Sequence, residues 1–135
     1  MALSNLDHIG IAVNSLAEGL QFYRDTLGMR LECTEEVPSE KVRVAILYSG
    51  DTRVELLEPT SDDSPIALFL KKRGPGVHHL AFSTENMSQS EKDLRAKAVQ
   101  VIEPFPRLGA HQCTVGFIHP KESKGVLIEL VERPS

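Results

Sequence analysis

Two histidines and two glutamates stand at matching places in the two halves of the sequence. His8 lies in LDHIGIAV and His79 in VHHLAFST, whereas Glu55 lies in VELLEP and Glu129 in IELVERP. Side chains alternate between the faces of a strand, so apolar residues flank each glutamate on both faces. An unpaired carboxylate in such a place is costly. A divalent metal held by all four side chains would compensate both glutamates.

The donor set limits which metal could be held. Imidazole nitrogen and carboxylate oxygen suit Zn, Co, Ni, Mn or Fe as divalent ions. Four protein ligands would leave one or two octahedral positions open for a substrate. Arg53 lies on the same strand face as Glu55 and is an alternative partner for that carboxylate. His78 lies on the opposite face from His79, and we expect it to be structural.

The same four residues mark an internal repeat. The two histidines are 71 positions apart (8 to 79) and the two glutamates 74 (55 to 129). Between them, Ser15-x-x-Glu18 and Ser88-x-x-Glu91 both read as capping boxes that begin a helix, 73 positions apart. Three landmarks in one order, with slowly growing offsets, indicate two copies of one module.

Each module is predicted to have the order βαβββ. In the first copy, a strand over 5–13 leads into a helix whose core face carries Leu16, Leu20, Tyr23 and Leu27 and which ends at Gly28. The other predicted strands are 30–37, 42–49, 52–59, 77–84, 99–104, 112–118 and 126–132, with a turn at Gly50-Asp51, a helix over 88–98 and a connecting helix over 64–73. Adjacent strands with one helix per unit favour an α+β fold with a curved, mostly antiparallel sheet.

Composition excludes several classes of protein. The chain has 135 residues, with 15 Lys and Arg against 19 Asp and Glu, a formal net charge of −4. This charge argues against a nucleic-acid partner. No apolar run reaches the roughly 18 residues of a membrane helix, and the first residues do not read as a signal peptide. Cys33 and Cys113 form no CxxC pattern, which indicates a reducing cytoplasm.

These residues carry a family resemblance. The paired modules with LDHIGIAV, VELLEP, GVHHLAF and GVLIELVE resemble the vicinal oxygen chelate superfamily, which includes glyoxalase I, extradiol dioxygenases and drug-resistance proteins. The resemblance implies one domain over 1–135, cupped around a metal: module 1 over about 4–60, a connecting helix over about 62–74 and module 2 over about 75–133. The implied metal ligands are His8, Glu55, His79 and Glu129.

Within the superfamily the chain resembles the methylmalonyl-CoA epimerases in particular. The stretches FYRDTLG, FLKKRGPGVHHLAF, PRLGA and FIHPKESKGVLIELVE carry this likeness. It implies interconversion of the two methylmalonyl-CoA epimers by a 1,1-proton transfer through a metal-stabilised enolate. Co²⁺ is the preferred ion, with Zn²⁺, Ni²⁺ and Mn²⁺ as alternatives, and a homodimer is expected. Some epimerases carry an acidic residue where this chain has Val44.

The resemblance also suggests roles for individual residues. Glu129 is the first choice for an acid/base group, Glu55 the second and Glu40 a weaker one. An acyl-CoA substrate carries phosphate charges, which basic residues of the loops would hold: Lys71, Lys72, Arg73, Arg107, Lys121 and Lys124. The alternatives are a glyoxalase I-type lactoylglutathione lyase and a metal-free small-molecule-binding or resistance protein. A dioxygenase fits less well, because it is expected to use two histidines and one carboxylate.

Overall fold

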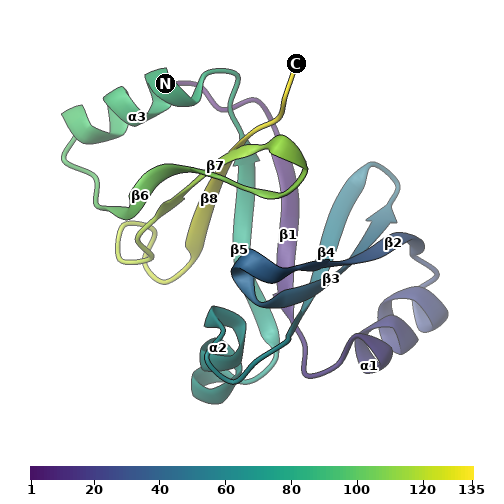
Figure 1. Ribbon diagram of the computed structural model, residues 1–135. Helices are drawn as coiled ribbons and strands as arrows, with labels where there is room; N and C mark the ends of the chain where they lie inside the picture. Colours follow the sequence, from purple (N-terminus) through teal and green to yellow (C-terminus); the bar gives the residue numbers. More distant parts are fainter. The chain divides into compact units, whose positions relative to one another are not determined.

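The computed structural model describes all residues 1–135 as a mixed α+β chain (Figure 1). Its strands are β1 (Leu6–Ala12), β2 (Arg30–Val37), β3 (Val42–Ser49), β4 (Thr52–Pro59), β5 (Gly76–Ser83), β6 (Val101–Leu108), β7 (Thr114–Ile118) and β8 (Leu127–Glu132). Its α-helices are α1 (Leu16–Leu20), α2 (Pro65–Arg73) and α3 (Met87–Ala96). None of these helices has the length and apolar character needed to cross a bilayer.

The contacts between residues divide the chain into two compact units. One unit is His8–His78, and the other joins Met1–Asp7 to His79–Ser135. The N-terminal segment is held to the later residues by backbone hydrogen bonds, in which Ser83 N donates to Asn5 O at 2.8 Å. The Arg133 guanidinium adds a bidentate ion pair with Asp7, at 2.8 and 2.9 Å.

The His8–His78 unit is built on four strands in the order β2-β3-β4-β1. The β2/β3 and β3/β4 pairs are antiparallel, and β1 runs parallel to β4. One apolar cluster joins Val13 to Leu16 of α1 and to Leu56 of β4, as expected for the strand face beneath the first helix. A second cluster joins Ala12 and Val44 to Ile66 of α2.

The second unit repeats this plan with four strands in the order β5-β8-β7-β6. Here β5 runs parallel to β8, while the β7/β8 and β6/β7 pairs are antiparallel. Met87 and Leu94 of α3 pack with Leu130 of β8. Another cluster brings together Ala81, Cys113, Val115 and Val131. The predicted α+β class and the mostly antiparallel pairing are therefore confirmed.

Local sequence signals predicted the strands of the first copy well. The observed β2, β3 and β4 have the predicted bounds of 30–37, 42–49 and 52–59. The turn between the last two is built on Gly50, whose φ of 58° lies in the left-handed region that glycine adopts without strain. In the second copy the predicted and observed ends of the strands differ by a few residues.

The first helix departs from its predicted face. After Leu20 the chain continues as a π-helix over Gln21–Thr26, in which Leu27 N donates to Phe22 O at 2.9 Å. The wider turn shifts the side-chain register, so that Met29 joins Tyr23 against the core and Leu27 is 55% exposed. The prediction that Leu27 lies on the core face is wrong for this reason. Gly28 ends the helix with φ of 76°, as expected.

The start of the helix in the second copy is also corrected. Ser15 caps α1 as predicted, since its Oγ accepts from Glu18 N at 3.1 Å. The cap of α3 is Asn86, whose Oδ1 accepts from Gln89 N at 3.0 Å, and not Ser88. The two caps are therefore 71 positions apart (15 to 86), the same offset as the two histidines. The corrected cap strengthens the repeat.

Candidate metal and substrate site

In the His8–His78 unit, a parallel strand pair brings His8 and Glu55 to one face. Gly10 of β1 lies in register with Glu55 of β4, and His8 is two residues before Gly10. Neighbours in register share a sheet face, as do alternate residues of a strand. The His8 Nδ1 to Glu55 Oε2 distance is 3.6 Å, and the side chains are 8% and 14% exposed.

The second unit builds the same arrangement from β5 and β8. Ala81 lies in register with Glu129, and His79 is two residues before Ala81. The His79 Nε2 to Glu129 Oε1 distance is 3.3 Å, with both residues buried. The repeat inferred from the sequence is therefore a repeat of a His/Glu pair on two parallel strands, in which the strand register sets the pair.

Arg53 gives Glu55 a second neighbour besides His8. Its Nε donates to Glu55 Oε2 at 2.9 Å, so the alternative partner that the sequence suggested does contact this carboxylate. An arginine that binds one oxygen of a carboxylate fixes its orientation, as the outer partners of metal-ligating carboxylates do. The Arg53 contact and a ligand role for Glu55 are therefore compatible.

Each pair fits a divalent metal by its chemistry. It supplies one imidazole nitrogen and one carboxylate oxygen, the donors that Zn²⁺, Co²⁺, Ni²⁺ and Mn²⁺ accept. Both carboxylates are largely shielded from water, where a charge needs compensation. The glutamates of the two pairs are the residues that the sequence singled out.

The basic residues predicted for substrate binding lie in different parts of the fold. Lys71, Lys72 and Arg73 form the exposed last turn of α2, where positive charge also complements the helix dipole. Lys121 and Lys124 are exposed in the turn between β7 and β8. Each of these five side chains is open to solvent.

Arg107 differs from the other basic residues, because it is half-buried on β6. Its guanidinium carbon lies 5.4 Å from the centre of the Phe117 ring. Its Nε donates to Pro104 O at 3.1 Å. Phe117 lies in register with Glu129, so Arg107 packs beside the residue next to the buried carboxylate.

The sequence motifs did not single out Glu35. This residue lies on β2 in register with Val44 of β3, which in turn lies in register with Leu57 of β4. Leu57 is the parallel partner of Ala12, so Glu35 shares the face of His8. The alternation Glu35–Glu36–Val37 is too short a signal to tell which acidic residue faces inward. Glu40, the weaker candidate, is exposed in the 3-10 turn that follows β2.

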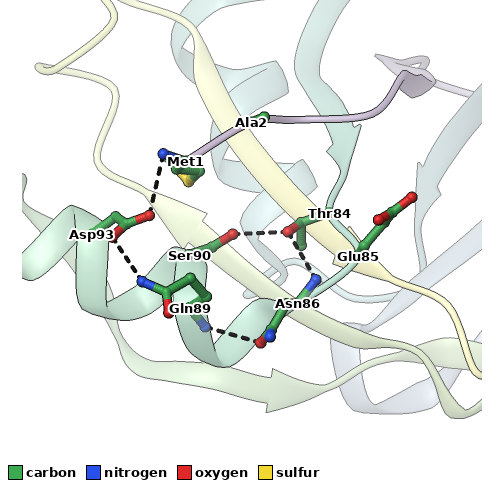
Figure 2. A pocket seen from close by; sticks show the side chains of 8 residues that line it. All are labelled: Met1, Ala2, Thr84, Glu85, Asn86, Gln89, Ser90 and Asp93. Carbon is green, nitrogen blue, oxygen red and sulfur yellow. Dashed lines mark hydrogen bonds and ion pairs between the residues drawn. The ribbon is translucent and has the colours of Figure 1, made fainter.

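A separate pocket lies at the start of α3 (Figure 2). Polar contacts surround it: the Thr84 and Ser90 hydroxyls are 2.8 Å apart, and the N-terminal amine lies 3.3 Å from Asp93 Oδ2. None of its eight lining residues is one of the predicted site residues. Met1 and Ala2 line it together with residues in and just before α3.

The two units, each with four strands and a His/Glu pair largely shielded from water, define a fold of duplicated modules whose side chains could hold a divalent metal. The chain belongs to the glyoxalase/bleomycin resistance protein/dioxygenase superfamily, whose family model matches residues 7–117. This finding confirms the superfamily that the sequence motifs resemble.

Individual relatives cover nearly the whole chain. An uncharacterised protein of Bacillus subtilis, YqjC, is 44% identical over 96% of this chain and 93% of its own length. The ethylmalonyl-CoA/methylmalonyl-CoA epimerase of Cereibacter sphaeroides is 35% identical over 95% and 97%. The structure of Streptomyces coelicolor methylmalonyl-CoA epimerase in complex with 2-nitronate-propionyl-CoA superposes with a TM-score of 0.92 at 39% identity, covering 99% of this chain and 100% of that one.

Proposed function

We propose that this protein is a metal-dependent methylmalonyl-CoA epimerase, which interconverts the (R) and (S) epimers by moving one proton at the α-carbon. The observation that carries the proposal is the duplicated His/Glu pair on two parallel strand pairs, in a chain of which 95% and 99% align with two epimerases. A relative at 44% identity, from B. subtilis, is uncharacterised, so the substrate itself is the object of the test below.

The proposed metal ligands are His8, Glu55, His79 and Glu129, one His/Glu pair from each module. The donor set suits Co²⁺, our first choice, and also Zn²⁺, Ni²⁺ and Mn²⁺. Once bound, such an ion supplies Lewis-acid stabilisation to negative charge that develops on the thioester oxygen.

Glu129 is the proposed first acid/base group. Its carboxylate is buried beside His79, and Phe117 is the strand partner in register with Glu129. The reacting carbon of the substrate would therefore meet this carboxylate in an apolar setting with little water. In such a setting a carboxylate is a stronger base toward carbon than in water, because hydration of the anion is reduced. The role assigned to it is to remove or return the α-proton on one face of the substrate.

The coenzyme A part of the substrate would be held electrostatically. Its phosphates would meet the exposed cations Lys71, Lys72 and Arg73 at the end of α2, together with Arg107, Lys121 and Lys124. Exposed lysines on a net acidic chain form local positive patches, which attract anionic ligands without a large net charge.

We also propose that the protein forms a homodimer. The strands β2 and β6 lie at the ends of the strand order, and exposed edges are a common route to association between copies. Light scattering coupled to size exclusion would give the mass of two chains if the proposal holds, and of one chain if it fails.

The direct test of function is a coupled assay with one pure epimer of methylmalonyl-CoA. A mutase specific for the other epimer consumes the product. We expect turnover by the purified protein, loss of turnover after thorough chelation, and recovery when Co²⁺ is added. Turnover of the methylglyoxal–glutathione hemithioacetal without any methylmalonyl-CoA turnover would instead identify a lactoylglutathione lyase.

A third outcome separates catalysis from binding. Tight binding of a small molecule with no turnover of either substrate, and with no response to metal, would identify a binding or resistance protein. Deuterium exchange at the α-carbon gives an independent reading. Glu129→Gln should abolish the exchange in at least one epimer while the fold, judged by circular dichroism, survives.

A further inference from the structure

Arg107 differs from the exposed basic residues in the way its guanidinium is held. The pairing of β6 with β7 shifts register between Ile102 and Arg107. Two carbonyl oxygens of this irregular stretch accept from the guanidinium, because Nε donates to Pro104 O at 3.1 Å and Nη2 donates to Ile102 O at 3.4 Å. The Phe117 ring adds a cation–π contact at 5.4 Å. These three contacts fix the guanidinium before any ligand binds.

The hydrogen bonds leave part of the Arg107 guanidinium available. Neither N–H group of Nη1 takes part in them. The side chain is half-buried, so these donors lie where water competes less than at the surface. A carboxylate is the acceptor that suits a guanidinium best, since both groups are planar and their donor and acceptor atoms match in spacing.

The strand register places Arg107 on the sheet face of Glu129, within one compact unit. Arg107 lies in register with Val115 of β7, which lies in register with Val131 of β8. Val131 is two residues from Glu129, and alternate residues of a strand share a face. Phe117 lies in register with Glu129, and its ring contacts the guanidinium. The Arg107 cation is therefore one side chain away from the carboxylate proposed to move the α-proton.

The proposed substrate has two kinds of anionic group that an arginine could bind. Its free carboxylate is bonded directly to the α-carbon, whereas the nearest phosphate is separated from that carbon by the thioester and the whole pantetheine chain. Because Glu129 must reach the α-proton, a cation one side chain away from Glu129 can meet the carboxylate and not a phosphate. Val115 and Val131, 8% and 3% exposed, make this face apolar, which strengthens a charged hydrogen bond.

We propose that Arg107 binds the free carboxylate of the acyl group and so selects thioesters that carry a carboxylate on the α-carbon. This inference rests on the proposed epimerase function and deepens it, and it replaces the phosphate contact that charge alone suggests for Arg107. Because the guanidinium is already held, binding costs little further side-chain entropy. A carboxylate fixed by Arg107 also fixes the α-carbon beside Glu129.

The test compares the binding of malonyl-CoA and acetyl-CoA. The two ligands differ only in the α-carboxylate, and neither has epimers. Titration calorimetry of the Co²⁺-loaded protein gives both dissociation constants, and we expect wild type to bind malonyl-CoA at least about 10-fold more tightly. Arg107→Gln should reduce this preference by about 10-fold and leave the affinity for acetyl-CoA within about 2-fold of wild type. The retained affinity for acetyl-CoA would show that the variant is folded.

Two further variants separate shape and charge. Arg107→Lys keeps the charge but loses the planar arrangement of donors, so it should retain only part of the preference. Lys121→Gln is the matched control, because it removes an exposed cation of the proposed phosphate contacts. It should weaken the binding of both ligands alike and leave the ratio of their dissociation constants unchanged.

Three results would overturn the assignment. The first is equal affinity of the wild-type protein for the two ligands, and the second is a preference that Arg107→Gln changes by less than about 3-fold. The third is equal weakening of both ligands in Arg107→Gln, which would identify a phosphate contact instead.

The binding measurement needs no turnover, so the two proposals can fail separately. If the wild-type protein does not epimerise methylmalonyl-CoA but shows a preference that depends on Arg107, the proposed function fails and the carboxylate site stands. If it epimerises methylmalonyl-CoA and the preference does not depend on Arg107, the function stands and this assignment fails.

Discussion

The Glu58 carboxylate at the end of β4 accepts a 2.7 Å hydrogen bond from the backbone N–H of Leu16, the first residue of α1. The repeat reproduces this contact, because Glu132 at the end of β8 accepts from Met87 N, the first residue of α3, at 2.5 Å. Glu58 lies three residues after Glu55, and Glu132 lies three residues after Glu129, the glutamates of the two His/Glu pairs. The same strand thus orients the site and anchors the helix of its module.

Removing this anchor should destabilise the protein without changing the site. Glu58→Ala leaves the first N–H of α1 without its carboxylate acceptor and removes negative charge from the positive end of the helix dipole. We expect a loss of about 1–2 kcal/mol in the free energy of unfolding, measured by urea denaturation. Glu132→Ala should cost a similar amount.

A control is needed because Glu58 also makes an ion pair: its Oε2 accepts from Arg43 at 2.6 Å. Glu36→Ala removes another partner of Arg43 and leaves α1 untouched. It should change stability by less than about 0.5 kcal/mol. Equal losses in the Glu36 and Glu58 variants would show that Arg43, and not the helix start, explains the effect.

A glycine under an aromatic ring provides the second prediction. A Cβ added to Gly116 of β7 would lie 2.3–2.7 Å from ring atoms of Phe105, which is 5% exposed. Because the buried ring has little space to move, Gly116→Ala should lower stability by about 1–3 kcal/mol. Gly76→Ala is the matched control, since a Cβ there meets nothing within 4 Å. A neutral Gly116→Ala in thermal melting would mean that Phe105 can shift freely.

Metal binding should be visible without any assay of activity. A ligand that binds only the folded state at 100 times its dissociation constant stabilises by about 2.7 kcal/mol. For a domain of this size, we expect Co²⁺ to raise the melting temperature of chelator-treated protein by several degrees. His8→Ala and His79→Ala should each abolish most of this rise.

The two histidine variants test whether both modules hold one ion. A rise that survives His8→Ala but not His79→Ala would show that one module binds the metal alone. His119→Gln is the control for histidine in general, because its ring lies in the turn after β7 and accepts from Lys121 N at 3.0 Å. It should leave the metal-dependent rise unchanged.

Coenzyme A recognition is tested through the end of α2. The double variant Lys71→Ala/Lys72→Ala removes two exposed charges near the substrate's proposed phosphate site. We expect KM for methylmalonyl-CoA to rise roughly 3- to 10-fold with kcat unchanged, and the difference from wild type to shrink at high salt. Lys92→Ala/Lys97→Ala, which removes an exposed lysine of α3 and the exposed lysine that caps its C-terminus, should leave KM unchanged. A fall in kcat alone would contradict a purely electrostatic binding role.

Local signals in the sequence determined much of the secondary structure and the residues of the two His/Glu pairs. Alternating apolar residues, the Gly50-Asp51 turn and the Ser15 cap predicted three strands with their observed bounds and the start of α1. The repeated His and Glu positions predicted both His/Glu pairs. Such signals suffice because side-chain alternation and turn conformation depend on a few neighbouring residues.

Tertiary structure alone decided the remaining features, because they depend on pairing between distant segments. The π-helical turn that turns Leu27 outward forms within the packing of α1 on its sheet. Glu35 faces inward because of the β2/β3 register, and a shift of one residue would have presented Glu36 instead. Glu58 meets Leu16 across 42 residues of chain. Contacts of this kind leave no local pattern in the sequence, since the two partners lie far apart along the chain.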